Sequence, residues 1–566
     1  MIKRNFLLII ILFFALAIRL WGISYNLPLS TDIDDEIVVL AGSLRMMAEN
    51  SLIISSSHGS YFPLSYYIYI PFLLVSILYI KFFTPLNTFA QIKELGLLHT
   101  GQFLIVGRLI SALFGVLSVF LIYLIAEKLF KNKRISLLSS LILSISPLNI
   151  LMSHFARVWT IQVFFMLLAV YFALKFFSKT ALEMTTKQAV FLGSLVGLSF
   201  FSNIVGLLIF VPVLVLAGHS FEKDRFKNFI LFLKTKSFIF FCATISIFIS
   251  LAYFLNRTSF SNFLVFFLSN TVERNNVFSV SLWGKFFYYP NTIFKYETVL
   301  FLLVLPALYL LFKRDKKNFY FLLSGFLTFY LFLGPLGGFV QTRFSLLMIP
   351  FLVLAMAYFV DYIWRFKKTV FTIFILIIVV LPGSFLSFKL DKTLARGGAN
   401  IAAYNWLLEN VPDGSKILFI NNYFLQDLFL TKESIAKIQK YSPEFYSSRM
   451  AYLSSLPGEK YPRPAYDVYQ ASMLCEWPEE EIKKTKFDYI FASEGVLKEI
   501  SGQDKISLCN RREINLKDFS KIYESFGETS YDSYYTSQGE DKILKSLEYF
   551  YGVENLDPKI FIYRRQ

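Results

Sequence analysis

Four acidic residues lie within five positions near the start of the chain, namely Asp32, Asp34, Asp35 and Glu36. Only 14 acids occur in the first 390 residues, so this clustering is unusual. Thr31 or Asp32 could cap a helix that runs to about Glu49, because acids are favoured in a first helical turn. Capping accounts for one or two acids, but four neighbouring negative charges repel one another and need a cation or hydrogen-bond donors. The cluster therefore predicts chemistry in addition to capping.

A carboxylate in such a cluster could act as a general base, taking the proton of a hydroxyl group as that hydroxyl attacks another atom. Carboxylate oxygens are also the ligands that hard divalent cations prefer, so Asp32, Asp34 and Asp35 could bind a metal ion. The residues alone leave both alternatives open. They indicate no other cofactor.

Three arginines could bring positive charge to the same place. Arg108, Arg157 and Arg343 each lie near an end of a predicted helix, on the side where other basic residues are rare. Guanidinium groups suit phosphate because their N–H donors match its oxygens in pairs. A lone arginine at a helix end can also reach lipid phosphate without a catalytic role. We expect the three together to hold a phosphate group.

Five further residues could contact a substrate: His58, Tyr61, His154, Lys285 and Tyr288. Lys285 and Tyr288 belong to a long predicted outer loop, residues 256–297, whose aromatic rings could stack on a substrate or cover the site. Histidines and tyrosines are also common at a membrane interface in purely structural roles. Both interpretations are open for each of the five.

The composition is that of an integral membrane protein, since 55% of the 566 residues are hydrophobic and only 17% are charged. About 20 apolar residues cross a bilayer as a helix, and runs near that length alternate here with Lys/Arg clusters. We expect eleven spans, over residues 5–23, 103–127, 135–152, 158–177, 188–203, 204–220, 237–255, 298–313, 318–336, 344–363 and 369–388. The fifth and sixth are divided at Ser202-Asn203.

The basic clusters orient these spans. If the apolar run Tyr61 to Phe83 does not cross, six Lys/Arg clusters share the cytoplasmic side, as the positive-inside rule requires. We therefore expect that run to be an interfacial or re-entrant helix within a first outer loop, about residues 24–102. The N-terminus is then cytoplasmic, and the tail lies outside the plasma membrane on the same side as this loop.

The predicted fold is an α-helical polytopic membrane domain, residues 1–390, followed by a soluble domain, residues 391–566. The first part has a net charge of +19 and the second a net charge of −3. Because the basic excess lies in short loops, it indicates membrane lipids and not nucleic acid as partners. Apolar stretches at 416–420, 487–491 and 559–563 predict strands of an extracytoplasmic α/β domain. A Cys475–Cys509 bridge could form there.

Several motifs resemble those of the GT-C glycosyltransferases, in particular the protein O-mannosyltransferases and the lipid A aminoarabinose transferase. The motifs are Asp35-Glu36 after a first span ending in Arg19-Leu-Trp-Gly22, then Tyr61-Phe-Pro-Leu-Ser-Tyr-Tyr67, Gly107-Arg-Leu-Ile-Ser-Ala-Leu-Phe-Gly115, Ser153-His-Phe-Ala-Arg157 and Gln341-Thr-Arg-Phe-Ser-Leu-Leu-Met-Ile-Pro350. In the tail, the stretches 404–415 and 487–491 resemble the exported domain of prokaryotic members. The order of these short motifs along the chain carries the resemblance.

The resemblance implies a donor made of one sugar on a polyprenyl phosphate, and inverting transfer to an acceptor hydroxyl on a protein or a glycolipid. It implies Asp35 as the base, with Glu36 and Asp34 as its neighbours. Two residues depart from the family pattern. Pro63 is a single proline where the family often has two, and Asn203 stands where many members have a lysine. These departures bear on the acceptor and phosphate contacts more than on the reaction class.

Two other classes of function are open at this point. A transporter or flippase for a lipid-linked sugar would carry ionisable residues in the middle of its spans, whereas nearly all charges here lie at span ends. A non-catalytic membrane scaffold that binds a partner through its tail would leave the acidic cluster without a role. Within the enzyme class, transfer of a whole oligosaccharide is a further alternative.

Overall fold

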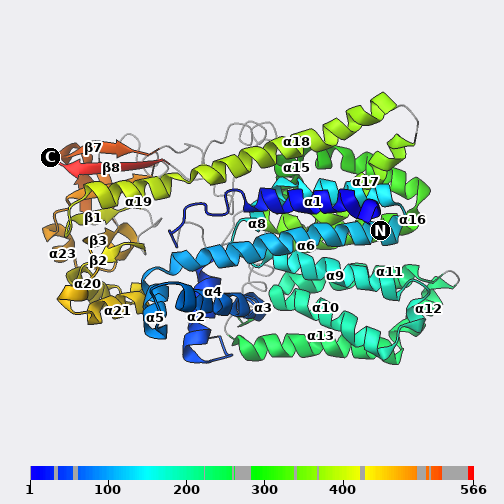
Figure 1. Ribbon diagram of the computed structural model, residues 1–566, viewed down its shortest axis with the longest axis horizontal. Helices are drawn as coiled ribbons and strands as arrows, with labels where there is room; N and C mark the ends of the chain where they lie inside the picture. Colours follow the sequence, from blue (N-terminus) through cyan, green and yellow to red (C-terminus); the bar gives the residue numbers. More distant parts are fainter. Residues whose placement is uncertain are drawn as a thin grey trace.

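The computed structural model describes residues 2–30, 36–54, 61–221, 224–257, 260–261, 282–336, 341–365, 369–420, 427–493, 505–508, 512–525 and 559–566. In Figure 1 these residues form a long helix bundle with a sheet domain at one end. Asp32, Asp34, Asp35 and His58 lie outside the described residues.

Helices form over the apolar runs. The bundle contains α1 (Ile2–Leu20), α6 (Leu104–Phe130), α7 (Lys133–Ser144), α8 (Pro147–Ser153), α9 (Trp159–Phe176), α10 (Thr186–Ser202), α11 (Phe210–His219), α12 (Arg225–Leu233), α13 (Lys236–Leu255), α15 (Leu282–Arg314), α16 (Lys316–Leu331), α17 (Ile349–Trp364) and α18 (Thr369–Arg396). Within the described part, six helical stretches are long and apolar enough to cross a membrane, or up to eight if each of two bent pairs forms one span. Three shorter apolar helices accompany them. The expected count of eleven stays a prediction.

The break between the fifth and sixth predicted spans lies where the sequence placed it. Helix α10 ends at Ser202, and Asn203 is extended, with φ −163° and ψ 143°. Its side chain accepts a hydrogen bond from the backbone N–H of Val205 at 3.2 Å. This bond satisfies one of the N–H groups left unpaired where the next helical segment, Ile204–Ile209, begins.

The first predicted outer loop is also helical, with α2 (Glu36–Glu49), α3 (Pro63–Tyr67), α4 (Ile70–Phe83) and α5 (Phe89–Leu98). These helices lie at the end of the bundle that carries the sheet domain (Figure 1). Leu29 and Leu98 pack into the core of that domain. The stretch Pro63–Phe83 is long and apolar enough to cross a membrane, so its interfacial placement stays a prediction.

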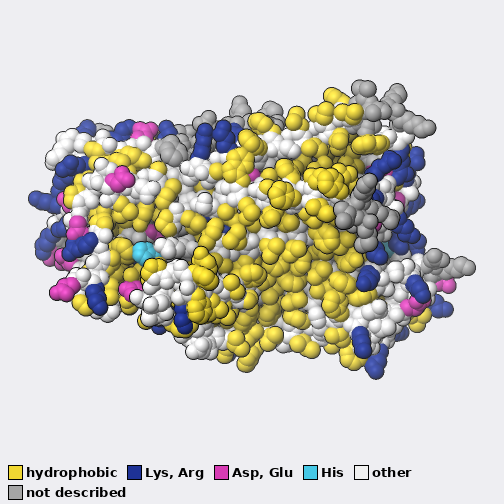
Figure 2. Space-filling view, in the orientation of Figure 1, with side chains coloured by type: hydrophobic (Ala, Val, Ile, Leu, Met, Phe, Trp, Pro, Cys, Tyr) yellow, Lys and Arg dark blue, Asp and Glu magenta, His cyan; other side chains and the backbone are white. Residues whose placement is uncertain are grey.

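Large apolar side chains cover the outside of the bundle. Phe13 of α1, Ile247 of α13 and Leu381 of α18 are 73%, 64% and 62% exposed. Figure 2 shows hydrophobic surface over most of the bundle, with Lys and Arg gathered at its far end and on the sheet domain. So large an apolar surface is unfavourable in water and faces lipid. The protein is therefore a multi-pass membrane protein.

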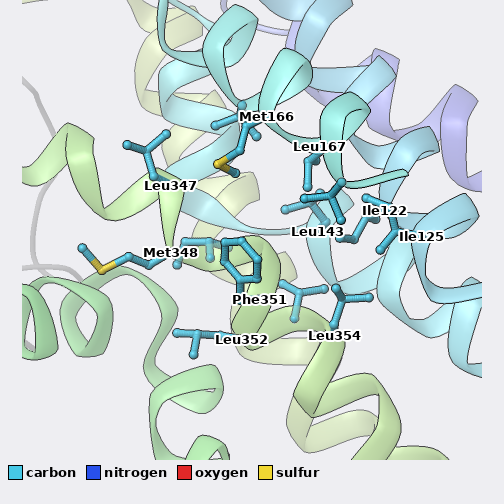
Figure 3. Packing of buried hydrophobic residues seen from close by; sticks show 14 of the residues in the cluster. Ile122, Ile125, Leu143, Met166, Leu167, Leu347, Met348, Phe351, Leu352 and Leu354 are labelled. Atoms are coloured by element: carbon cyan, nitrogen blue, oxygen red, sulfur yellow. The ribbon is translucent and has the colours of Figure 1, made fainter. Parts of the chain in front are cut away.

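Most of the bundle helices contribute to one large apolar core. Ile122 of α6, Leu143 of α7, Met166 of α9 and Phe351 of α17 belong to it, and Figure 3 shows them packed together. A Cβ atom at Gly325 of α16 would lie 2.2 Å from the Phe351 ring. Glycine there lets α16 approach α17 closely.

The tail folds into the predicted α/β domain. Its main sheet has the order β2-β3-β1-β4-β8-β7, formed by β1 (Lys416–Phe419), β2 (Phe429–Leu430), β3 (Ala465–Gln470), β4 (Tyr489–Ser493), β7 (Phe519–Glu524) and β8 (Ile560–Arg565). The first four are parallel, and β8 runs antiparallel to both β4 and β7. Strands β5 (Lys505–Leu508) and β6 (Arg512–Asn515) form a separate antiparallel pair. The three predicted strands are β1, β4 and β8.

Helices flank this sheet: α19 (Ala399–Asn410), α20 (Lys432–Tyr441), α21 (Ser448–Ser455), α22 (Ala471–Leu474) and α23 (Glu479–Lys484). Helix α18 runs to Arg396, past the predicted domain boundary at residue 390. Gly397, with φ +74°, then turns the chain towards α19. Cys475 is disulfide-bonded, Cys242 is a free thiol, and Cys509 lies outside the described residues.

Candidate functional site

Glu36, at the start of α2, forms a buried bidentate ion pair with Arg108 of α6. The Nε–Oε1 and Nη2–Oε2 distances are 3.1 and 2.8 Å, and both side chains are 1% exposed. Arg108 Nη1 also donates to the backbone oxygens of Ile23 and Tyr25, at 3.0 and 2.6 Å. A buried pair needs such additional hydrogen bonds, because desolvation otherwise outweighs the attraction between the charges. Arg108 thus ties α2 to α6 and to the segment that follows α1.

The same carboxylate contacts the loop before α9. The backbone N–H of Ala156 donates to Glu36 Oε1 at 2.5 Å. Arg157 comes next in the chain and is 1% exposed. Its backbone N–H donates to Ser111 Oγ, and its backbone oxygen accepts from the same hydroxyl, at 3.3 and 3.1 Å. The end of the acidic cluster therefore touches the loop that carries Arg157.

Arg343 joins this region from a distant part of the chain. Its guanidinium carbon lies 5.0 Å from the centre of the Trp159 ring, a cation–π contact that fixes its orientation. Trp159 begins α9, two residues after Arg157, and packs edge-to-face on Phe344 with ring centres 5.2 Å apart. These contacts place the loops of Arg157 and Arg343 side by side.

The first part of α15 approaches the Arg343 loop. Tyr288 Oη lies 3.3 Å from Thr342 Oγ1, one residue before Arg343. Tyr289 is fully buried beside it, with the two rings edge-to-face. Lys285 is half-buried about one turn earlier on the same helix. Two of the candidate substrate contacts thus lie on one helical segment, and Tyr288 lies next to the loop that carries Arg343.

His154 and Tyr61 are held by contacts within the protein. The two ring nitrogens of His154 lie 2.9 and 2.8 Å from the backbone oxygens of Ile150 and Trp21. His154 Nε2 is also 3.6 Å from the Asp391 carboxylate of α18. The backbone N–H of Tyr61 donates to Tyr66 Oη, and its backbone oxygen accepts from Asn256. The fifth candidate contact, His58, lies outside the described residues.

Two further buried charges, which are not among the candidate site residues, lie in the bundle. Arg19 is fully buried and donates to Ser153 Oγ at 3.2 Å and to Asn149 Oδ1 at 2.5 Å. Glu297 accepts from Ser146 Oγ and from the backbone N–H of Leu148, where α7 and α8 meet at 58°. Arg19 lies inside the predicted span 5–23, and an ionisable residue within a span is a recognised functional signal that could have found it. Glu297 lies in the predicted outer loop 256–297, where no such signal marks it.

The sheet domain holds the residue that precedes the acidic cluster. The backbone N–H of Ser30 lies 3.0 and 2.9 Å from the two carboxylate oxygens of Asp427, and Ser30 Oγ is 2.6 Å from Oδ1. Arg449 fixes the acidic partner in turn, since it donates to the backbone oxygens of Asp427 and Leu428. Ser30 and Glu36 border residues 31–35, so the sheet domain holds one end of this segment and the bundle holds the other.

Comparisons with known proteins find a family match and similar solved structures. Residues 89–249 match the dolichyl-phosphate-mannose-protein mannosyltransferase family. ArnT from Cupriavidus metallidurans bound to undecaprenyl phosphate has a similar structure, with a TM-score of 0.51 at 12% identity over 89% of this chain and 96% of ArnT. Its apo state gives 0.53 at 11% identity over 90% and 97%.

The archaeal oligosaccharyltransferase AglB from Archaeoglobus fulgidus, in complex with an inhibitory peptide and a dolichol-phosphate, gives a TM-score of 0.49 at 12% identity over 88% of this chain and 70% of AglB. No curated protein sequence matches the chain. At identities this low, the ArnT structures establish a shared fold.

Proposed function

The chain is a membrane protein with the GT-C glycosyltransferase fold, as its motifs predicted, and we propose that it is an inverting glycosyltransferase. Its donor is a sugar linked to a polyprenyl phosphate, and its acceptor is a hydroxyl group of a protein or a glycolipid. The undecaprenyl phosphate bound to ArnT supports this donor class. We place the reaction on the extracytoplasmic face of the plasma membrane, where the first loop and the sheet domain meet.

One observation carries the proposal: the hydrogen bond from the Ala156 N–H to the Glu36 carboxylate. It fixes one end of the acidic cluster against the loop of Arg157, and Trp159 connects that loop to Arg343. Asp35 is bonded directly to Glu36 in the chain. This contact supports the proposal that Asp35 acts as the base and that Arg157 and Arg343 bind the phosphate at the same end of the bundle, as transfer from a phosphate-linked donor requires.

In the proposed reaction, the Asp35 carboxylate takes the proton of the acceptor hydroxyl as the hydroxyl oxygen bonds to the anomeric carbon. The bond between that carbon and the phosphate oxygen breaks, and its electron pair leaves with the polyprenyl phosphate. Attack from the opposite face inverts the anomeric centre. Arg157 and Arg343 stabilise the negative charge that grows on the phosphate, so no strong acid is needed.

We assign Arg108 a positioning role. Its guanidinium group already donates to both Glu36 oxygens and to two backbone oxygens. The phosphate contact that the sequence suggested for it would need a further donor from the same buried group. Arg108 instead acts through Glu36, by keeping the acidic cluster at the end of α6.

A divalent cation held by Asp32, Asp34 and Asp35 is the alternative role for the cluster. Transfer measured with and without a chelator separates the two roles. A base requires no metal, whereas loss of transfer on chelation and its recovery with added cation would support coordination.

The substrate can be identified by mass spectrometry of envelope glycans and lipids from cells that lack the protein. We expect one sugar to disappear from the glycans and its polyprenyl-phosphate donor to accumulate. Wild-type protein restores both, and so does Asp518→Asn, which changes an exposed carboxylate of the sheet domain. Asp35→Asn restores neither. Full restoration by Asp35→Asn would contradict the assignment of the base.

The two rival functions predict different results. A flippase would also lead to donor accumulation, but the purified protein would release no polyprenyl phosphate from donor and acceptor. A scaffold would tolerate alanine at positions 34–36 and lose its function when residues 391–566 are deleted.

A further inference from the structure

A cavity of about 280 Å³ lies at the other end of the bundle from Glu36 and Arg108, lined by Arg314, Tyr358, Asp361, Tyr362 and Arg365. Arg314 ends α15, the next three residues lie on α17, and Arg365 follows that helix. Asn132, the N-cap of α7, also reaches this place, because its Nδ2 donates to Asp361 Oδ2 at 3.0 Å. Residues from three of the Lys/Arg clusters that the sequence assigns to the cytoplasmic side, at 128–134, 313–317 and 365–368, therefore meet at the cavity, namely Asn132, Arg314 and Arg365.

Two guanidinium groups are held in place at its rim. Arg365 Nε and Nη2 donate to Asp361 Oδ2 at 2.9 and 2.7 Å, while 62% of the arginine side chain is exposed. Arg314 lies over the Tyr362 ring at 4.7 Å, and its Nη2 donates to the Tyr362 hydroxyl at 3.1 Å. Arginines fixed by a carboxylate or a ring lose little freedom on binding a ligand, and their N–H donors suit a phosphate group.

Asp361, the acidic residue that lines the cavity, indicates that the ligand carries a hydrogen-bond donor. Asp361 is only 2% exposed, and its Oδ1 has no hydrogen-bond partner among the described residues. A buried carboxylate oxygen without a donor is costly. The nearby Asp315 differs, because it caps α16 through two hydrogen bonds to Asn318. A ligand that brings a hydrogen-bond donor to Asp361 would remove this cost.

We propose that the cavity binds a phospholipid headgroup of the inner leaflet whose phosphate is followed by a hydrogen-bond donor, as in phosphatidylethanolamine or phosphatidylglycerol. Arg314 and Arg365 hold the phosphate, and Asp361 accepts from the ammonium or hydroxyl group. The cavity volume is just below roughly 300 Å³, the lower end of the usual range for small-molecule pockets. The cavity therefore suits a lipid headgroup and not a polyprenyl-linked sugar. Basic pockets between helices on the cytoplasmic side are common lipid sites.

The test uses the purified full chain, titrated with dioleoyl phosphatidylethanolamine, phosphatidylglycerol or phosphatidylcholine and followed by native mass spectrometry. We expect phosphatidylcholine to bind more weakly than the other two, because its quaternary ammonium carries no N–H. Arg314→Gln should weaken binding of all three about tenfold, as loss of a charged hydrogen bond does. Lys313→Gln is the matched control, since it removes a neighbouring basic residue that does not line the cavity.

Asp361→Asn tests the donor contact separately, because it should lower the preference for phosphatidylethanolamine over phosphatidylcholine. Thermal unfolding without lipid shows that each variant is folded. Equal effects of Arg314→Gln and Lys313→Gln would overturn the site. Equal binding of all three lipids to the wild type, together with full displacement by inorganic phosphate, would overturn the headgroup assignment.

Discussion

Two arginine–carboxylate pairs lie near opposite ends of α6 and differ in burial. Arg108 and Glu36 are both 1% exposed, and the carboxylate also accepts a backbone N–H. In the second pair Asp361 is 2% exposed, but Arg365 is 62% exposed. Arg108 is enclosed by the oxygen atoms to which it donates, whereas Arg365 lies at the surface. Both arginines form an ion pair, so the ion pair alone does not tell their roles apart. The buried arginine can only connect parts of the protein, whereas the exposed one can also bind a ligand.

The largest effect is expected from Arg108→Gln. This change leaves the Glu36 carboxylate buried without its cation, which costs about 3–5 kcal/mol of unfolding free energy. Thermal unfolding of the purified protein in detergent measures the loss. Arg45→Gln is the matched control, because Arg45 pairs with Glu49 on the surface of α2, where both side chains are more than a third exposed. Equal melting of Arg108→Gln and the wild type would contradict the role of the buried pair.

The double variant Arg108→Gln with Glu36→Gln, compared with its two single variants, tests whether the two side chains act as a pair. If the two side chains act as a pair, the double variant is more stable than the sum of the single changes predicts. Additive losses would show that each residue acts through other contacts.

A middle-sized effect on activity is expected from Asp427→Ala. The change removes all three hydrogen bonds to Ser30, so residues 31–35 lose their tie to the sheet domain while Arg108 still holds Glu36. Misplacement of a catalytic group by about 1 Å can cost a factor of about 100, so we expect kcat to fall about 10- to 100-fold with little change in the donor KM. Steady-state transfer kinetics measure this split.

Ser30→Ala provides the graded control for this contact. It removes the hydroxyl bond but keeps the two backbone contacts to Asp427, so its effect on kcat should be the smaller of the two. A rise in donor KM with unchanged kcat in Asp427→Ala would place this contact in donor binding and not in positioning of the base.

The smallest effect is expected from Arg365→Gln. Arg365 is exposed, so solvent weakens its attraction to Asp361. Its loss still removes two donors from a buried carboxylate, which keeps the hydrogen bond from Asn132, so we expect the unfolding free energy to fall by about 1–2 kcal/mol in the absence of lipid. A ligand that binds the folded state raises its stability, so the difference from the wild type should grow when phosphatidylethanolamine is added. Melting curves with and without that lipid measure the change. A difference that does not respond to lipid would exclude Arg365 from the lipid site.

The sequence predicted the elements better than their contacts. Apolar runs located the helices, and the polar side chain of Asn203 marked the break before α11, because local composition determines where a helix can continue. The three apolar stretches in the tail became β1, β4 and β8 for the same reason. Length and apolar composition do not distinguish an interfacial helix from a span, so the position of Pro63–Phe83 was beyond this kind of argument.

Contacts between distant residues carried weaker signals. Arg157 and Arg343 stood out as charges at predicted helix ends, but nothing in the sequence indicated that Trp159 would lie between their loops. No feature of the sequence marked Asp427 as a partner of Ser30. The two residues are 397 positions apart, and only the fold of the sheet domain brings them together. The pairing of Arg108 with Glu36 likewise depends on how α2 packs on α6.

The central claim is tested most directly with the purified full chain and the polyprenyl-phosphate sugar that accumulates in cells lacking the protein. Release of polyprenyl phosphate in the presence of acceptor measures transfer, and binding of the same donor is measured in parallel. We predict release by the wild type, at least about 100-fold slower release by Asp35→Asn with donor binding retained, as loss of a general base entails, and weakened donor binding by Arg343→Gln. Release by Asp35→Asn at the wild-type rate, or no release by any form of the protein, would contradict the account.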